Sequence, residues 1–584
     1  MRNIFVITIF CALSVVSQKL WAQNLDPTVE VTREYEGKLM ETHKPVLEMT
    51  VPDSVTRFAL DFDYSVFEKP YKGSYDFNPY LLSMKPTSAD MGENILFLKA
   101  GAGYQLKPEF DLVWSPKFKD RGLNVDVYAL HRSFVGDYWN VSPTLNHGGS
   151  AYLMDRKPKS STDRVWFGYD LLSRAGADFR YDAKGVAIDL GAGYYGLAQK
   201  DRMWGRRSFN ALDANLGLST KPQSAESMAF DMSVRYRFSD DHMPEIVGLS
   251  EQILNFDMSF GPIRAGKHKF FIDLGLDMVD YRKAFSASVG EVVLVPHYIF
   301  RSEYVCLDAG LRLAKLLRGT QDAGMFQARE QIVYPDIEFY YTLIPEAMKL
   351  YVKAEGGNTI NTYSSILEKN HHMIYTSAPM PLDCTLERVT VTLGLDGRIS
   401  SVFSYNLRGG YANYGNAFLD AVDYSLKAEP LASFRYVPYN KWFAALDWCF
   451  RIEDFVFDAS FDYTHAWGDV FKGTEDVAIL KPALVTGDVS FEYNWRRRIF
   501  FGADCNFSTE RKGAWMINAV NGEKLDYALK LPGYADLGVY GEYVSPHLLS
   551  YWFRVGNLLN MTVQRNPLYA EKGVNFTVGI SLSL

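Results

Sequence analysis

The sequence lacks any long apolar run after its first 23 residues. Beyond that point no stretch of about 18 consecutive apolar residues occurs, which is the length that a helix needs to cross a bilayer. We therefore expect no transmembrane helix in the remainder of the chain. If the protein enters a membrane, it must do so with strands, because only helices and closed barrels satisfy every backbone hydrogen bond in lipid.

Cysteine is also scarce, with five in 584 residues. Cys11 follows Phe10 rather than a small residue, which argues against a lipoprotein cleavage at that point. The other four are far apart and include no C-x-x-C pair, so neither a zinc site nor a redox motif is predicted, and a disulfide stays open. We expect inert thiols, since no histidine on the strands of Cys306 and Cys449 offers a base. The four residues are Cys306, Cys384, Cys449 and Cys505.

No long basic run balances the acidic residues. The chain has 61 Lys and Arg against 69 Asp and Glu, a formal net charge of −8. A protein that binds nucleic acid by neutralising phosphates needs the opposite balance, so nucleic acid is excluded as a partner. The one conspicuous cluster, Arg496 to Arg498, lies at a predicted turn. We interpret it as a solvated basic turn, with lipid headgroup phosphates or a periplasmic partner as the alternative.

Patterns typical of enzymes are missing as well. Gly191 to Gly196 fits G-x-G-x-x-G, but no helix follows it, so we interpret these glycines as part of a strand rather than a dinucleotide site. His371 and His372, with Glu368 nearby, could bind a metal, but adjacent histidines on an extended chain point in opposite directions. We expect a solvated loop there. The sequence predicts no enzyme, no cofactor and no metal site.

What the sequence does contain begins with an export signal. Residues 1–23 have a positive residue, Arg2, then an apolar core from Ile4 to Val16, and a cleavage point near Ala22 or Gln23. The segment 24–94 is mixed in character and is predicted to be a separate N-terminal segment, periplasmic or inside the barrel. From residue 95 to residue 584 the chain becomes a series of amphipathic strands.

The last eleven residues show the strand pattern most clearly, because apolar residues alternate there with small or polar ones up to the C-terminus. Such full contrast between two faces is typical of a strand with lipid on one side and water on the other. We predict that this strand pairs with the first strand and closes a barrel. Aromatic residues make up 15% of the chain, as expected for interfacial girdles. The apolar members are Val574, Phe576, Val578, Ile580, Leu582 and Leu584.

About 22 such strands are predicted, which makes the fold class all-β, a transmembrane antiparallel β-barrel. Short turns are expected on the periplasmic side, near residues such as Ala183, Pro345 and Arg497, and long loops are expected outside. The long gaps are 136–162, 318–330, 357–385, 414–440, 465–481, 510–533 and 561–572. The predicted strands are 95–104, 108–118, 122–134, 163–182, 186–197, 207–218, 226–239, 250–262, 267–281, 291–299, 302–316, 331–343, 347–356, 386–397, 400–413, 441–451, 453–464, 482–496, 499–509, 534–545, 548–560 and 573–584.

Alternation also predicts which charged residues face the lumen. We expect Arg235 and Arg237 to face acids across the same wall, either filtering solutes or satisfying one another. Cys306 with Asp308 and Arg312, and Cys449 with Asp447, belong to the same face. The acids are Asp231, Asp257, Asp273, Asp277, Asp458, Asp462 and Asp488.

The C-terminal run from Val555 resembles the end of a TonB-dependent receptor barrel. It contains Gly556-Asn557-Leu558-Leu559-Asn560, Pro567, Gly573 and the ending Gly579-Ile580-Ser581-Leu582-Ser583-Leu584. The family usually ends on an aromatic residue, so Leu584 is a departure. The resemblance implies an outer-membrane location, a barrel of 22 strands and contact with lipid, lipopolysaccharide and the barrel assembly machinery.

The front of the chain departs from the family, whose globular plug precedes the barrel. Only about 70 residues separate the predicted signal from the first strand, so the plug is expected to be largely missing. Asp26-Pro27-Thr28-Val29-Glu30-Val31 faintly resembles the short box with which such receptors bind TonB by adding a strand; the alternative is an extended tail. The expected function is solute uptake across the outer membrane. The alternative is a structural or assembly barrel within a larger outer-membrane complex.

Overall fold

The computed structural model describes the barrel region of the chain. Residues 1–94 lie outside the described residues, and with them the predicted signal, the predicted N-terminal segment and the segment Asp26–Val31. From residue 95 onward the structure describes the chain to Leu584 except for a few positions. These are 105, 117, 119–121, 146–150, 204, 221–227, 245, 266, 319–330, 374–382, 424–429, 473–476, 519–523, 547 and 572.

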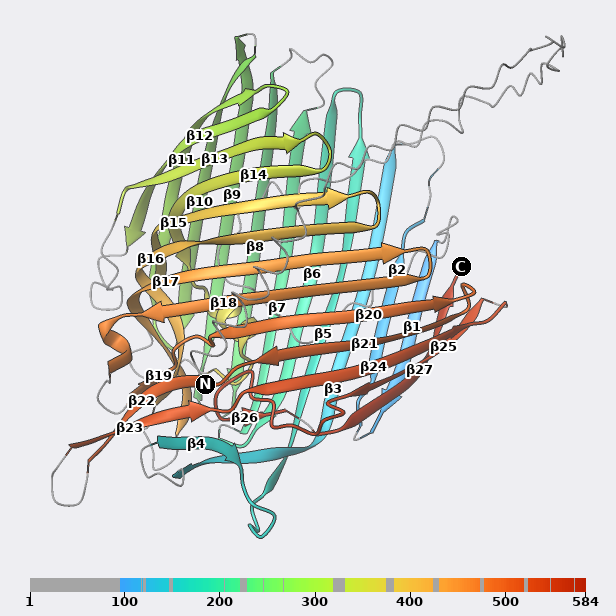
Figure 1. Cartoon of the computed structure of the whole chain (residues 1–584), viewed down its shortest axis with the longest axis vertical. Coiled ribbons are helices and arrows are strands. Elements are labelled where there is room, and N and C mark those ends of the chain that lie inside the picture. Colours follow the sequence, from blue (N-terminus) through green and yellow to red (C-terminus); the bar gives the residue numbers. More distant parts are fainter. Residues whose placement is uncertain are drawn as a thin grey trace, which may run out of the picture. The chain divides into compact units, whose positions relative to one another are not determined.

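Twenty-two strands form a closed antiparallel barrel, as predicted. Each strand pairs with the next around the ring, and β27 pairs with β1 from Phe97↔Ser583 to Gly103↔Thr577. Figure 1 shows these first and last strands, blue and red, side by side. The barrel strands are β1 (Leu96–Gly103), β2 (Glu109–Trp114), β3 (Leu123–Leu145), β5 (Val165–Asp182), β6 (Val186–Asp201), β7 (Gly205–Thr220), β8 (Ala229–Met243), β9 (Ile246–Ala265), β10 (His268–Lys283), β11 (Ala287–Arg301), β12 (Val305–Arg318), β13 (Val333–Ile344), β14 (Met348–Ile360), β15 (Cys384–Ile399), β16 (Phe403–Asp423), β17 (Leu431–Ile452), β18 (Phe455–Trp467), β20 (Val485–Trp495), β21 (Ile499–Ser508), β24 (Tyr534–Val544), β25 (Leu549–Gly556) and β27 (Asn575–Ser583).

The remaining described elements lie in the connections. Strand β4 pairs in parallel with β23 and antiparallel with β3, and β22 pairs with β23, so two connections share one small sheet. Among the described residues, no helix has the length and apolar character that crossing a membrane requires. These elements are β4 (Ala151–Arg156), α4 (Tyr363–Lys369), η1 (Asp469–Lys472), β19 (Val477–Ile479), β22 (Arg511–Asn518), β23 (Lys524–Leu531) and β26 (Tyr569–Ala570).

The outer face of the barrel carries an apolar band bounded by aromatic residues. On β17, the exposed Trp442 and Ile452 are ten residues apart on the same face. At about 3.3 Å per residue and a tilt of roughly 40°, they are about 25 Å apart along the barrel axis, the height of a lipid-facing band. Trp467 stacks on Trp442 at one level, and Trp495 is exposed at the other. The outer face therefore matches the hydrocarbon layer.

Long and short connections are separated between the two ends of the barrel. Connections such as 183–185, 345–347 and 496–498 are short and lie at one end, which we call the short-turn end. All seven gaps predicted to be long lie at the other, the long-loop end, but most of the predicted gap 414–440 is strand, since β16 runs to Asp423 and β17 begins at Leu431. The alternation is not uniform, however, because β6 to β11 are joined by short connections at the long-loop end too.

Several strands are longer than the sequence predicts. Strand β6 reaches Asp201 instead of residue 197, and β11 begins at Ala287 instead of residue 291. The extra residues continue the hydrogen-bonded ladder beyond the apolar band, where the outward side chains no longer need to be apolar. The period-two signal therefore ends before the strand does.

Buried apolar residues gather inside the long-loop end. The largest cluster joins inward side chains of β5 to β12, β15 and β17 with residues of α4. A second cluster connects the small sheet to the connection between β25 and β27. The hydrophobic core of this protein thus lies inside the barrel, between its walls and its own connections.

Candidate functional site

The connection between β14 and β15 enters the barrel and forms helix α4 there. Thr362 caps the helix by accepting the backbone N–H of Ser365 at 3.2 Å. The carboxylate of Glu251, on β9, accepts the N–H groups of Tyr363 at 2.7 Å and Ser364 at 3.1 Å. A carboxylate at a helix N-terminus satisfies free donors and interacts favourably with the helix dipole. The wall thereby fixes the first turn of the helix.

The apolar side of α4 contacts opposite walls of the barrel. Tyr363, Ile366 and Leu367 are fully buried and share one cluster with Phe209 of β7 and Phe434 of β17. Burial of each large side chain contributes about 1.5–3 kcal/mol. Helix α4 consequently lies between opposite walls at this level instead of along one wall.

A buried arginine holds the chain that follows the helix. Arg207, on β7, donates to the carbonyl oxygens of His371 at 2.6 Å and Met373 at 2.5 Å. Its Nε lies 3.4 Å from Asp241, which also accepts the hydroxyl of Tyr363. The buried charge of Arg207 is therefore matched by Asp241 and used to bind two backbone carbonyls, as a buried ion requires.

His371 is buried and His372 is mostly covered, so their interpretation as part of a solvated loop is wrong. His371 Nδ1 lies 2.8 Å from Asp170 of β5, and His372 Nδ1 lies 2.8 Å from Asp201 of β6. The side chains are only 7% and 13% exposed. As expected for adjacent histidines, they point to different partners. Among the residues that the structure describes, no group of three or more His, Cys, Asp or Glu is placed to hold a metal ion.

A second connection joins this arrangement from the other side. Tyr569, between β25 and β27, stacks on His372 with ring centroids 3.4 Å apart and donates its hydroxyl to Asp201. Burial, followed by the charge of Asp201, raises the pKa of Tyr569 well above its usual value, so the phenol stays a neutral donor. We call residues 361–373 together with Tyr569 the cap.

Glu368 faces charged residues of the wall and not the histidines. It lies 3.0 Å from Arg237 of β8 and 3.6 Å from Arg174 of β5. Arg237 also binds Asp213 of β7 with a distance of 2.5 Å. The predicted inward direction of Arg237 is therefore right, but its partners are Asp213 and Glu368, which the sequence pattern did not identify.

Below the cap, three of the predicted luminal acids pair with residues that the prediction did not name. Asp277 accepts from Asn255 at 2.6 Å, Asp488 accepts from Asn506 at 2.6 Å, and Asp462 lies 3.9 Å from Arg408. The four described cysteines form no disulfide with one another. The glycines of the G-x-G-x-x-G pattern belong to β6, in agreement with their interpretation as strand residues.

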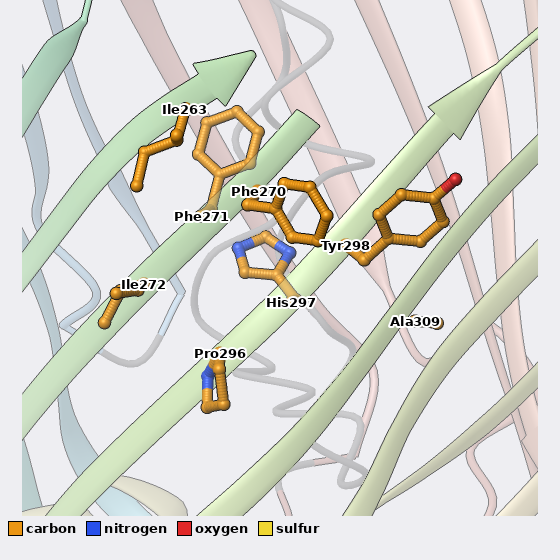
Figure 2. Close-up of a pocket in the computed structure, with 8 residues that line it drawn as sticks. All are labelled: Ile263, Phe270, Phe271, Ile272, Pro296, His297, Tyr298 and Ala309. Carbon is orange, nitrogen blue, oxygen red and sulfur yellow. The ribbon is translucent and has the colours of Figure 1, made fainter. Parts of the chain in front are cut away.

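The barrel wall itself has a hollow of about 290 Å³, lined by residues of β9 to β12. Figure 2 shows its lining, in which His297 is surrounded by Phe270, Phe271 and Tyr298. The two ring nitrogens of His297 lie 3.1 Å from Asp273 and 3.0 Å from Asp308. Both ring nitrogens of His297 are thus paired with carboxylates of the wall. The hollow therefore presents mainly apolar surface, with few polar groups left to bind a ligand.

Comparison with known proteins adds information at the level of fold. No family model and no curated protein matches the sequence. The FrpB iron transporter from Neisseria meningitidis has a TM-score of 0.61 over 84% of this chain and 82% of its own, at 9% identity. The copper transporter OprC gives 0.57, with 84% and 80% covered at 11% identity. A variant of the ferric enterobactin receptor PfeA from Pseudomonas aeruginosa gives 0.56, also with 84% and 80% covered at 11% identity.

The chain is a β-barrel with the fold of the TonB-dependent receptors. The resemblance carried by the C-terminal residues is confirmed for the fold. At 9–11% identity, the comparison carries over no binding residue from these proteins. The cap of this receptor-fold barrel is described by its own contacts alone.

Proposed function

We propose that the protein takes up a solute across the outer membrane through its lumen. The observation that carries this proposal is a closed barrel of 22 strands with a charged interior, sharing its fold with transporters of iron and copper. The cap is the gate in this proposal, because α4 and Tyr569 lie inside the long-loop end. Uptake then requires the cap to leave the wall when the solute binds.

The remaining assignments complete the same proposal. Residues 1–23 direct export, and residues 24–94 form a segment at the periplasmic side or in the lumen. Asp26–Val31 supplies the strand that TonB pairs with, which couples the gate to an energy source. The barrel assembly machinery inserts the protein, and lipid and lipopolysaccharide surround it. No catalytic step and no cofactor is part of this function.

Uptake is tested without knowing the solute. Cells with and without the gene are grown in a complex medium, and the solutes left in the medium are compared by mass spectrometry. We expect at least one solute to stay in the medium when the gene is absent, and to be consumed again when the full chain is restored. Identical media from both strains would refute the uptake proposal.

A second function is favoured by one observation, the number of buried contacts that hold the cap. Arg207, Asp170 and Asp201 are each engaged with the cap, and such pairs are costly to break. A permanently closed barrel would serve as a structural subunit of a larger outer-membrane complex. Purification from the native membrane in mild detergent distinguishes the two: a stoichiometric partner protein supports this function, and a protein that elutes alone contradicts it.

A further inference from the structure

The short turn between β20 and β21 has an unusual sequence for its backbone. The N–H of Arg498 donates to the carbonyl of Trp495 at 3.2 Å, so Arg496 and Arg497 are the central residues of the turn. Both have left-handed φ angles, 55° and 56°. Turns of this kind favour Asn and Gly, because other side chains are strained there. Two arginines at these positions therefore need a reason other than the turn itself.

The three arginines of this turn are exposed and unpaired. Among the described residues, no carboxylate lies within ion-pair distance of Arg496, Arg497 or Arg498. Glu453 and Asp454 are exposed on the neighbouring turn, where the carbonyl of Asp454 accepts the N–H of Asn494, but neither forms an ion pair with the arginines. The turn thus presents three cationic groups to whatever surrounds this rim.

The height of the turn indicates what surrounds it. Trp495 faces outward at the lower boundary of the apolar band, and the guanidinium of Arg496 lies over its ring at 5.5 Å. Ile452, on β17 two strands away, is also exposed outward at this boundary. Exposed aromatic rings at such a boundary lie at the level of lipid headgroups. An arginine stacked on one of them is placed beside the headgroup phosphates.

We propose that the turn Trp495–Arg498 binds the phosphate groups of glycerophospholipids in the inner leaflet of the outer membrane. The short-turn end faces the periplasm in barrels of this class, so the inner leaflet supplies these headgroups. Guanidinium groups match phosphate geometry and bind it with charge-assisted hydrogen bonds. The surface is distinct from the cap and is independent of the uptake proposal.

The test uses a variant that improves the turn while removing charge. R496N/R497G introduces the residues that this backbone favours, so folding should be at least as good as in the wild type. The full-length protein in detergent is titrated with phosphatidylglycerol and with phosphatidylcholine of the same chain length, and bound lipids are counted by native mass spectrometry. Lys184→Asn, which removes a single exposed cation from the turn 183–185 at the same end, is the matched control.

We expect the wild type to prefer phosphatidylglycerol and the double variant to bind it about 25-fold more weakly, about fivefold for each arginine. Phosphatidylcholine binding and heat modifiability on gels should not change, and Lys184→Asn should behave as the wild type does. The proposal is overturned if the double variant keeps its preference, if the wild type does not distinguish the two lipids, or if lipid A is the only anionic lipid whose binding is lost.

Discussion

Replacing Glu251 with glutamine should loosen the cap. The carboxylate of Glu251 accepts the N–H groups of Tyr363 and Ser364 at 2.7 and 3.1 Å, and the hydroxyl of Ser239 at 3.2 Å. Glutamine has nearly the same size, but its amide group is a donor on one side. In Glu251→Gln one backbone N–H of α4 therefore faces another donor, and the helix loses the negative charge at its N-terminus.

The magnitude follows from the number of contacts that change. Hydrogen bonds to charged groups contribute roughly 1.5–3 kcal/mol each, and two of them tie the helix to this carboxylate. Glutamine keeps one oxygen acceptor, so one of these bonds is lost, which destabilises the closed cap by about 1.5–3 kcal/mol and corresponds to roughly a 10- to 10²-fold larger open population. The apolar contacts of Tyr363, Ile366 and Leu367 stay in place. The cap should then open for part of the time while the barrel remains folded.

Conductance of the purified protein in planar bilayers measures this opening directly. We expect brief conducting events in Glu251→Gln that are absent or much rarer in the wild type. Glu346→Gln, at an exposed position in a short turn, is the control that removes the same charge without touching the cap. Equal conductance of all three proteins, with the same heat modifiability, would refute the idea that Glu251 holds the gate.

Three further outcomes are expected. Phe256→Lys should lower the folded yield, because a lysine on the lipid side costs roughly 2–4 kcal/mol near the midplane, whereas Asp257→Lys on the luminal side should not; equal yields would show that this strand does not face lipid. Gly579→Ala should impair closure of the barrel, since a Cβ there would lie 2.2 Å from the carbonyl oxygen of Ala100 and 2.4 Å from the Trp552 ring, while Gly193→Ala, with its nearest contact at 3.5 Å, should assemble normally on a heat-modifiability gel. Deletion of residues 24–94 behind an intact signal should leave a folded barrel that admits vancomycin; a folded barrel with unchanged vancomycin sensitivity would mean that the cap alone closes the lumen.

The sequence by itself determined the barrel. Along each strand, successive side chains point alternately to the lipid and to the lumen. The contrast between neighbours such as Phe576 and Thr577 is therefore a local property that is visible in the sequence. The count of strands and the ends at which long loops lie follow from repeating that local signal. Where strands leave the lipid, as in β6 beyond residue 197, the signal ends and the predicted bounds are too short.

Only the tertiary structure shows that the cap lies inside the barrel and which wall residues hold it. His371 looked like a residue of a solvated loop, because its partner Asp170 is 201 positions away and no local pattern connects them. Arg207 and Glu251 are likewise ordinary strand residues until α4 is placed against them. A lumen brings residues from opposite walls together only after the ring has closed. Contacts across the lumen therefore depend on closure of the barrel, and the sequence of a single strand carries no information about them.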